Sequence, residues 1–285
     1  MTEDTPFDRR LRRLRRDRAA SVFGTANYLH RLAADELLDR LSTVRRDFRS
    51  ALDLGCHDGY LAARLREAGI QVTCADSGLL FAGAAAGVQA DEDRLPFADA
   101  SFDLVVSVGA LDSVNDLPGA LTLIRRSLKP DGLFLAAFAG AGSLPRLRSA
   151  MSAADAVGGA ASPRIHPQID VRAAGDLLTR AGFKLQVADS ASVEVRFPSL
   201  IGLVRDLRAM GATNIAAARS TVPVGRRGIA AALAEFGAAA DTDGKTGERF
   251  EIVYLTGWAP SPDQPQPARR DSATASLADA LRKRR

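Results

Sequence analysis

The chain contains few cysteines and histidines and has no long apolar segment. Two cysteines and three histidines occur among its 285 residues. Cys56 and Cys74 have neither a CxxC spacing nor a Cys/His pairing, which argues against a disulfide framework and a structural zinc site. A reducing compartment is therefore expected. The longest apolar runs, such as residues 133–142, are shorter than a membrane span.

Signatures of several catalytic classes are also missing. His30, His57 and His166 lack the His-x-acid spacing that is typical of a non-haem iron site. No Gly-x-Ser-x-Gly segment marks the nucleophile elbow of a serine hydrolase. His166 precedes Pro167 and is expected to be an ordinary loop residue. No metal site is expected, and the function has to be sought in ligand-binding motifs.

The positive charge is concentrated at the two ends of the chain, whose net charge is +4. Residues 1–18 hold seven arginines and four acidic residues, and residues 261–285 hold six basic and three acidic residues. Residues 19–260 are therefore slightly acidic. Because an enzyme that acts on nucleic acid usually carries positive charge on the binding face of its core, no nucleic-acid partner is expected.

The two charged ends differ in their patterns. Apolar residues recur at helical spacing among the first arginines: Phe7, Leu11, Leu14 and Val22. A mitochondrial presequence shares this pattern, but the four acidic residues disfavour that alternative. We expect residues 1–35 to form an amphipathic helical segment that packs on the domain through these apolar side chains. Residues 261–285 are rich in proline, serine and arginine and are predicted to be a disordered tail.

Residues 36–260 alternate short apolar runs with helical patterns. Strands are predicted at 50–54, 70–75, 88–90, 102–108 and 133–138, and helices at 60–68 and 117–128. Continuous apolar strands separated by helices indicate a parallel sheet that is covered on both faces. Right-handed crossovers then make this region one doubly wound, Rossmann-like α/β domain.

Acidic residues follow three consecutive predicted strands. Asp53–Gly59 follows the first strand, and its glycines, Gly55 and Gly59, let the backbone approach a ligand. Asp76 ends the second strand, where a carboxylate can accept both hydroxyls of a ribose. Asp91 follows the third, where it can meet an adenine amino group. Because ligands of such sheets bind beyond the carboxyl ends of the strands, a nucleoside site is predicted. The alternative is that these acids only cap turns.

Five motifs then resemble a known family: Leu52-Asp53-Leu54-Gly55-Cys56, Asp76, Asp91 with Leu95-Pro96-Phe97, Ser101-Phe102-Asp103-Leu104-Val105, and Leu128-Lys129-Pro130-Asp131-Gly132. Together they resemble the class I S-adenosylmethionine-dependent methyltransferases of ubiquinone and biotin synthesis, including the malonyl-carrier-protein methyltransferases. The resemblance covers about residues 7–260. It implies a class I methyltransferase sheet with an N-terminal helix and a helical cap.

Other segments are more similar to one branch, the mitochondrial complex I assembly factor with a methyltransferase fold, an arginine hydroxylase. They are Phe7-Asp8-Arg9, residues 114–119, 178–183, 197–200 and 250–258, and Asp206-Leu207-Arg208-Ala209-Met210-Gly211 followed by Asn214. The last segment is a narrow signature. The fold is therefore shared between relatives whose reactions differ.

The resemblance implies S-adenosyl-L-methionine as the cofactor and assigns its contacts. The expected cofactor-binding residues are Asp53, Gly55, Cys56, Gly59, Asp76, Ser77, Asp91, Glu92 and Ser107. Expected substrate contacts are His57, Asp112 and Asn115. His57 replaces the middle glycine of the usual loop, and its ring faces either the cofactor or the solvent. Asp112 stands where the family often has an aromatic residue or histidine.

The first hypothesis is an S-adenosylmethionine-dependent methyltransferase whose acceptor is a small carboxyl, a quinone-like ring or a protein side chain. An accessory protein for respiratory complex I that hydroxylates a protein arginine is the alternative. A dinucleotide oxidoreductase is disfavoured because Gly55 and Gly59 do not make Gly-x-Gly-x-x-Gly. Residue usage favours a bacterial cytoplasm over a mitochondrial matrix. Residues 140–170 and 190–248 lie outside the minimal alternation and are predicted to cap the cofactor mouth.

Overall fold

The secondary structure consists of seven strands and eleven helical segments within residues 5–158 and 162–264, which this computed structural model describes. The strands are β1 (Ser50–Leu54), β2 (Gln71–Asp76), β3 (Val88–Gln89), β4 (Phe102–Val108), β5 (Leu128–Ala139), β6 (Lys184–Phe197) and β7 (Thr246–Trp258). The α-helices are α1 (Arg9–Ala20), α2 (Tyr28–Ser42), α3 (Tyr60–Glu67), α4 (Leu79–Ala84), α5 (Leu117–Ser127), α6 (Pro145–Gly158), α7 (Val171–Arg180), α8 (Leu200–Ala209) and α9 (Arg226–Ala238). Two 3-10 helices, η1 (Phe23–Thr25) and η2 (Leu111–Ser113), complete the set.

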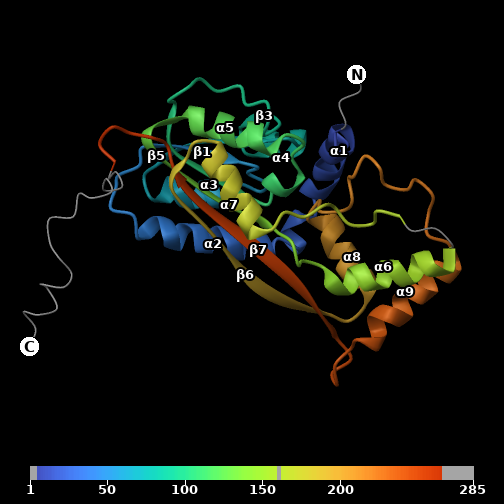
Figure 1. Cartoon of the computed structure of the whole chain (residues 1–285). Coiled ribbons are helices and arrows are strands. Elements are labelled where there is room, and N and C mark those ends of the chain that lie inside the picture. The colour runs from blue at the N-terminus through green and yellow to red at the C-terminus, as the bar shows by residue number, and fades with distance from the viewer. Residues whose placement is uncertain (1–4, 159–161, 265–285) are drawn as a thin grey trace, which may run out of the picture.

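All seven strands belong to one sheet, which helices cover on both sides (Figure 1). Its order is β3-β2-β1-β4-β5-β7-β6. The first five strands pair in parallel, and β7 is antiparallel to both β5 and β6. The order reverses between β1 and β4, so the crevice beyond their carboxyl ends is the place where such sheets bind ligands.

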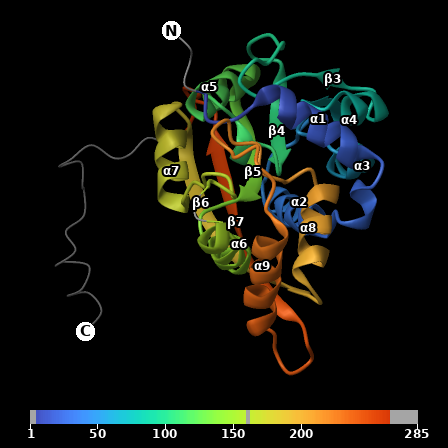
Figure 2. The same ribbon diagram turned by 90° about the vertical axis from the view of Figure 1, so that its right-hand side faces the viewer.

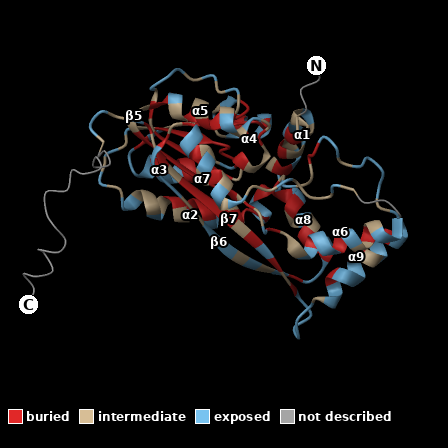
Figure 3. Cartoon of the chain, viewed as in Figure 1, coloured by how far each residue is buried: buried red, intermediate tan, exposed pale blue. Residues whose placement is uncertain are grey.

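Each face of the sheet has its own apolar core, because successive side chains of a strand point to opposite faces. Leu104 and Leu135 pack with α2 and α3 on one face. Their neighbours in the sequence, Val105 and Phe134, pack with α5 and α7 on the other. Figure 3 shows the central strands as the buried layer between these helices. The predicted doubly wound sheet is confirmed.

Several of the remaining helices lie beyond the edge of the sheet at which the parallel strands end. Helices α6 and α9 pack against each other beyond the long strands β6 and β7, and α1 lies beside α4 (Figure 2). No helix of the described residues is long and apolar enough to cross a membrane.

The second predicted cap segment, residues 190–248, was predicted to begin too early in the sequence. Residues 190–197 were expected to belong to the cap but form the second half of β6, at the edge of the sheet. Most of its side chains are exposed, so β6 lacks the continuous apolar run that identified the central strands. Of the predicted tail, residues 265–285 lie outside the described residues.

The N-terminal segment packs on the domain through Phe7, which is 6% exposed as expected, but not through Leu14 of α1 or Val22 after that helix. Leu14 and Val22 are 43% and 44% exposed, whereas Arg12 and Arg16 are 6% and 5% exposed. The helix begins after Asp8, whose Oδ1 accepts the backbone N–H of Leu11 at 2.9 Å. The expectation failed because apolar spacing does not reveal which acidic residues of the domain attract the arginines.

Candidate active site

The loop after β1 needs glycine at its first position. Gly55 and Gly59 have φ values of 79° and 74°, in the left-handed region that glycine adopts without strain. A Cβ atom on Gly55 would lie 2.4 Å from the Cβ of Ala110, so the backbones of the two loops approach too closely for any side chain. His57 also has a positive φ, of 47°. This is the turn that the sequence placed at the cofactor.

Two buried polar atoms behind this loop have no hydrogen-bond partner among the described residues. They are Oδ2 of Asp53 and Oγ of Ser77. Burial raises the pKa of Asp53 well above its usual value, and the nearby Cys74 and Asp76 raise it further. Buried polar groups are nearly always satisfied in native proteins, so these atoms support a polar ligand at this position.

Asp76 is fully buried and accepts four hydrogen bonds. Its Oδ1 accepts from Nε of Arg16 at 2.8 Å and from the backbone N–H of Gly78 at 2.7 Å. Its Oδ2 accepts from Nη2 of Arg16 at 2.5 Å and from the backbone N–H of His57 at 3.1 Å. Burial alone would raise the pKa of Asp76, but the ion pair with Arg16 and these hydrogen bonds lower it. A carboxylate has about four acceptor positions, so Asp76 is saturated.

The acids that follow β3 are also paired with α1. Glu92 accepts from Nη1 and Nη2 of Arg12 at 2.6 and 2.8 Å. Asp91 accepts from Nη2 of Arg13 at 2.6 Å and from Nη1 of Arg9 at 3.3 Å. Every acid that the sequence placed beyond β2 and β3 as a cofactor contact therefore binds an arginine of one helix.

Side chains fill the space beside the glycine loop. His57 is 4% exposed and stacks on Phe23 with their ring centroids 4.8 Å apart. Its Nε2 lies 3.0 Å from the carbonyl oxygen of Val108. The alternative that this ring faces the solvent is therefore wrong. The cavity that touches the loop measures about 20 Å³, enough for about one water molecule, so a nucleoside requires side chains to move.

Three other predicted contacts have local structural partners. Oγ of Ser107 donates to the carbonyl oxygen of Leu54 at 2.7 Å and so joins the ends of β4 and β1. Asn115 binds the backbone of Phe7 through both amide atoms, at 2.8 and 3.1 Å, and anchors the segment before α1. Cys56 is buried as a free thiol. Asn115 does not line the large cavity described next.

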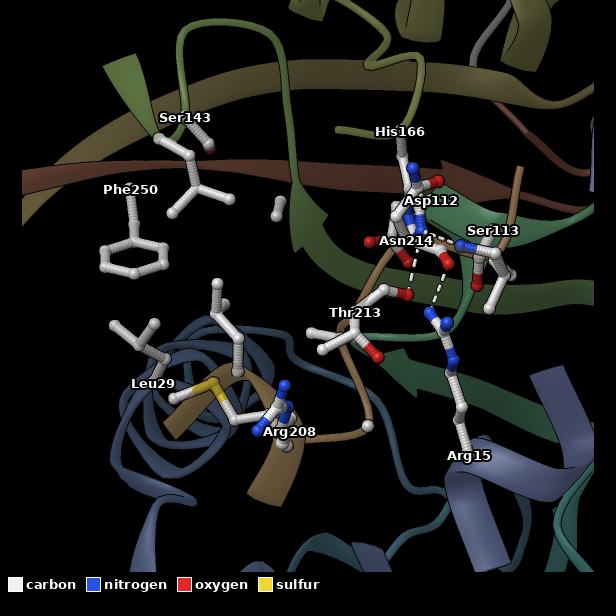
Figure 4. Close-up of a pocket in the computed structure, with 18 of the residues that line it drawn as sticks. Arg15, Leu29, Asp112, Ser113, Ser143, His166, Arg208, Thr213, Asn214 and Phe250 are labelled. Atoms are coloured by element: carbon white, nitrogen blue, oxygen red, sulfur yellow. Dashed lines mark hydrogen bonds between the residues drawn. The ribbon is translucent and has the colours of Figure 1, made fainter. Parts of the chain in front are cut away.

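A cavity of about 940 Å³ opens at the carboxyl ends of β4 and β5. Gly109 and Ala139 lie on the side of the sheet, and both predicted cap segments contribute to the wall, for example through Leu147 and Met210. Val108 and His30 line both this cavity and the small one at the glycine loop. Figure 4 shows Leu29, Phe250 and Ser143 in one part of the cavity and Asp112, His166 and Asn214 in another.

Arginines dominate the charge of this cavity. One acidic residue, Asp112, lines it together with seven arginines: Arg12, Arg15, Arg16, Arg18, Arg164, Arg205 and Arg208. Three of these are in ion pairs: Arg12, Arg16 and Arg164. Among the described residues no carboxylate lies within 4.0 Å of the other four. Burial lowers the pKa of Arg15, as do the nearby Arg219, Arg18 and Arg208.

Asp112 and His166 form the polar end of the cavity with Arg15 and Asn214 (Figure 4). Nε2 of His166 lies 2.7 Å from the backbone nitrogen of Ile215 and 3.0 Å from the carbonyl oxygen of Thr213. Burial lowers the pKa of His166 and raises that of Asp112. His166 was expected to be an ordinary loop residue, but it is half-buried against the cavity.

The pairing of the α1 arginines with the acids of the site was not predicted from the sequence. The signal was present, because Arg9, Arg12, Arg13 and Arg16 share one helical face and Asp91-Glu92-Asp93 is the densest acidic segment of the domain. Complementary charge patterns do not by themselves show that two segments meet. Within the described residues no group of three His, Cys, Asp or Glu side chains is placed to hold a metal ion.

This geometry matches that of known methyltransferases. The model of a methyltransferase domain matches residues 52–136. Among solved structures, a putative methyltransferase from Bacillus halodurans C-125 aligns with a TM-score of 0.55 at 15% identity and covers 79% of this chain and 98% of its own. That similarity concerns the fold.

Two kinds of curated relative align over most of the chain. The mitochondrial arginine-hydroxylase NDUFAF5 of Danio rerio is 35% identical, over 96% of this chain and 88% of its own. A malonyl-[acyl-carrier protein] O-methyltransferase of Methylovorus sp. is 33% identical, over 86% of each chain. The chain therefore belongs to the S-adenosylmethionine-dependent methyltransferase family that includes these relatives. The family implies S-adenosylmethionine as the cofactor.

Proposed function

We propose that the protein binds S-adenosylmethionine at the loop 55–59 and transfers its methyl group to an acceptor in the large cavity. The position of that cavity carries the proposal, because it opens beyond β4 and β5 and shares Val108 and His30 with the glycine loop. S-adenosylmethionine supplies an electrophilic methyl group on a sulfonium. The protein then has chiefly to align the acceptor with it.

The acids beyond β2 and β3 suit this cofactor once the arginines of α1 no longer occupy their carboxylate oxygens. Asp76 would accept the ribose hydroxyls, and Asp91 or Glu92 would accept the adenine amino group. The unsatisfied atoms of Asp53 and Ser77 add two polar positions behind the loop. In the present structure, which we call the closed arrangement, these acids are paired with arginines of α1. Cofactor binding and arginine pairing therefore compete for the same carboxylate oxygens.

The charge of the cavity supports an acidic acceptor. Arg15, Arg18, Arg205 and Arg208 line it without carboxylate partners among the described residues. They would hold a carboxylate in its charged form, which is nucleophilic without a general base. The apolar wall would receive the body of such a molecule. A malonyl thioester, the acceptor of one group of relatives, has this chemistry.

Hydroxylation of a protein arginine, the activity of the other relatives, is the second candidate. The carboxylate of Asp112 favours it, because it faces the cavity and accepts no side-chain hydrogen bond from the described residues. A guanidinium pairs readily with such a group. A subunit of respiratory complex I is the partner that this candidate implies. The cellular compartment stays a prediction.

Two measurements test these proposals. Titration calorimetry with S-adenosylmethionine tests the cofactor, and an absence of binding would refute methyl transfer. Transfer of labelled methyl from S-adenosylmethionine to a malonyl thioester tests the acceptor class, with an arginine peptide as the competing substrate. Arg208→Ala should raise KM for the thioester, whereas Arg10→Ala on the exposed face of α1 should leave it unchanged. Preference for the peptide would instead support the second candidate.

A further inference from the structure

One face of α1 presents four arginines to the acids of the nucleoside site. Their positions follow the spacing i, i+3, i+4 and i+7, which places them on the same side of a helix. The pairs are Arg9 with Asp91 and Asp93, Arg12 with Glu92, Arg13 with Asp91, and Arg16 with Asp76. The carboxylates in these pairs are at most 4% exposed. We call this set of four arginines the arginine stripe.

Arg16 and a ribose would need the same two oxygens of Asp76. Two of its four hydrogen bonds come from backbone N–H groups, of His57 and Gly78, which belong to the site itself. Only the two bonds from Arg16 can be exchanged. The two hydroxyls of a ribose would replace the two donors of one guanidinium. The pair and the bound nucleoside therefore exclude each other.

Arg16 is packed closely against the nucleoside site on one side and borders the large cavity on the other. A Cβ atom on Gly78 would lie 2.9 Å from the Cβ of Arg16, so the helix rests directly on the turn after β2. The guanidinium Cζ lies 5.5 Å from the centroid of the Phe81 ring, and Nη2 lies 3.4 Å from Nδ1 of His57. Arg16 is 5% exposed. Movement of the helix would free Asp76 together with the other acids that α1 pairs, whereas a turn of Arg16 into the cavity would free Asp76 alone.

The closed arrangement also leaves two buried polar atoms of the site without hydrogen-bond partners among the described residues. Asp53 Oδ2 and Ser77 Oγ have no partner while α1 is docked. Meanwhile α1 leaves Leu14 43% exposed and buries Arg12 and Arg16, so charge pairs supply much of its attachment. A ligand that replaces those pairs at Asp76 offsets part of the cost of releasing them. These features suit a segment that is exchanged for a ligand.

We propose that α1 is a displaceable latch on the nucleoside site, in which the arginine stripe and the cofactor compete for Asp76 and its neighbouring acids. The proposal rests on the proposed function, since it takes S-adenosylmethionine as the ligand. The apparent dissociation constant is the intrinsic constant divided by the fraction of molecules in the open state. The strength of the stripe thus sets the cofactor concentration at which the protein loads.

Hydrogen–deuterium exchange of the full-length protein tests the latch directly. The amides of α1 should exchange faster when S-adenosylmethionine is added at saturation, because binding shifts the population toward the open state. The amides of α5, on the opposite side of the sheet from α2, should not change. Increased protection of α1 on binding would overturn the proposal, because the helix would then close over the cofactor instead of leaving it.

Affinity supplies the second measurement. Arg16→Ala should bind S-adenosylmethionine about tenfold more tightly than the wild type, a change of about 1.4 kcal/mol in the closed-state equilibrium. Arg10→Ala, an exposed arginine of the same helix without a carboxylate partner among the described residues, is the matched control and should bind like the wild type. Weaker binding by Arg16→Ala would show that Arg16 supports the bound state and would overturn the latch.

The latch and the function fail in different ways. If neither the wild type nor Arg16→Ala binds S-adenosylmethionine, the proposed function and the latch are both refuted. If the wild type binds while α1 keeps its exchange rate, only the latch is refuted. Should Arg16→Ala prove too unstable to purify, the exchange experiment on the wild type still decides between these results.

Discussion

Arg12 and Glu92, eighty residues apart in the sequence, form a two-pronged ion pair with side chains only 7% and 1% exposed. Nη1 and Nη2 of Arg12 bind the two carboxylate oxygens, and Nη2 also donates to the carbonyl oxygen of Ala110 at 3.0 Å. This pair connects the first helix to the segment after β3. It shows how the basic start of the chain is neutralised by the acidic middle.

Arg12→Ala should lower the free energy of unfolding by about 3 kcal/mol, because it leaves the carboxylate of Glu92 buried without its partner. The double variant Arg12→Met with Glu92→Leu should recover most of that loss, since both charges are removed together. Urea denaturation measures both. A single variant as stable as the wild type would mean that Glu92 is reached by solvent or protonated.

Asp76→Ala should weaken S-adenosylmethionine binding by roughly 100- to 10,000-fold, because two hydrogen bonds to a charged group contribute roughly 1.5–3 kcal/mol each. The carboxylate is buried against Arg16, so its loss alone would leave that arginine buried without a partner. Calorimetry should therefore compare Arg16→Ala with Arg16→Ala/Asp76→Ala, because neither variant leaves Arg16 buried without its carboxylate partner. Equal affinities would leave Asp76 without a role in ribose binding.

Gly55→Ala should be far more destabilising than Gly59→Ala, although both glycines have positive φ. Nothing lies within 4 Å of a Cβ on Gly59, whereas a Cβ on Gly55 meets that of Ala110 at 2.4 Å. We expect losses of about 1–2 kcal/mol for Gly59→Ala, from backbone strain alone, and at least about 3 kcal/mol for Gly55→Ala. Thermal and urea unfolding compare them, and similar values would contradict the close approach of the two loops.

The stability of the protein should decrease as the pH falls from about 6.5 toward 4. Burial, followed by the charge of Arg16, lowers the pKa of His30 from 6.5 to about 4. Between these values the unfolded chain binds a proton that the folded protein does not, so acid favours unfolding. The effect reaches at most about 3 kcal/mol for this residue. Urea denaturation at pH 7.5 and 4.5 measures it, and His30→Gln should flatten the dependence.

The sequence alone was enough to predict the five parallel strands of the sheet and the positions of the acids that follow them. β1 and β4 have the predicted bounds, because central strands covered on both faces must be continuous apolar runs. Asp76 and Asp91 follow from the same pattern, since the carboxyl ends of parallel strands share one edge. The need for glycine at position 55 was likewise predictable from the sequence, because a tight loop beside another backbone leaves no space for a side chain.

Only the tertiary structure decided what those acids bind in the closed protein. The apolar spacing of the first segment pointed to Leu14 and Val22, yet the domain buries Arg12 and Arg16. Helical periodicity identifies which residues share a face but not the partner that this face meets, and here the partner is a cluster of acids sixty or more residues away. The position of His166 at the cavity depended equally on long-range packing, because the loop that holds it is fixed by the distant Ile215.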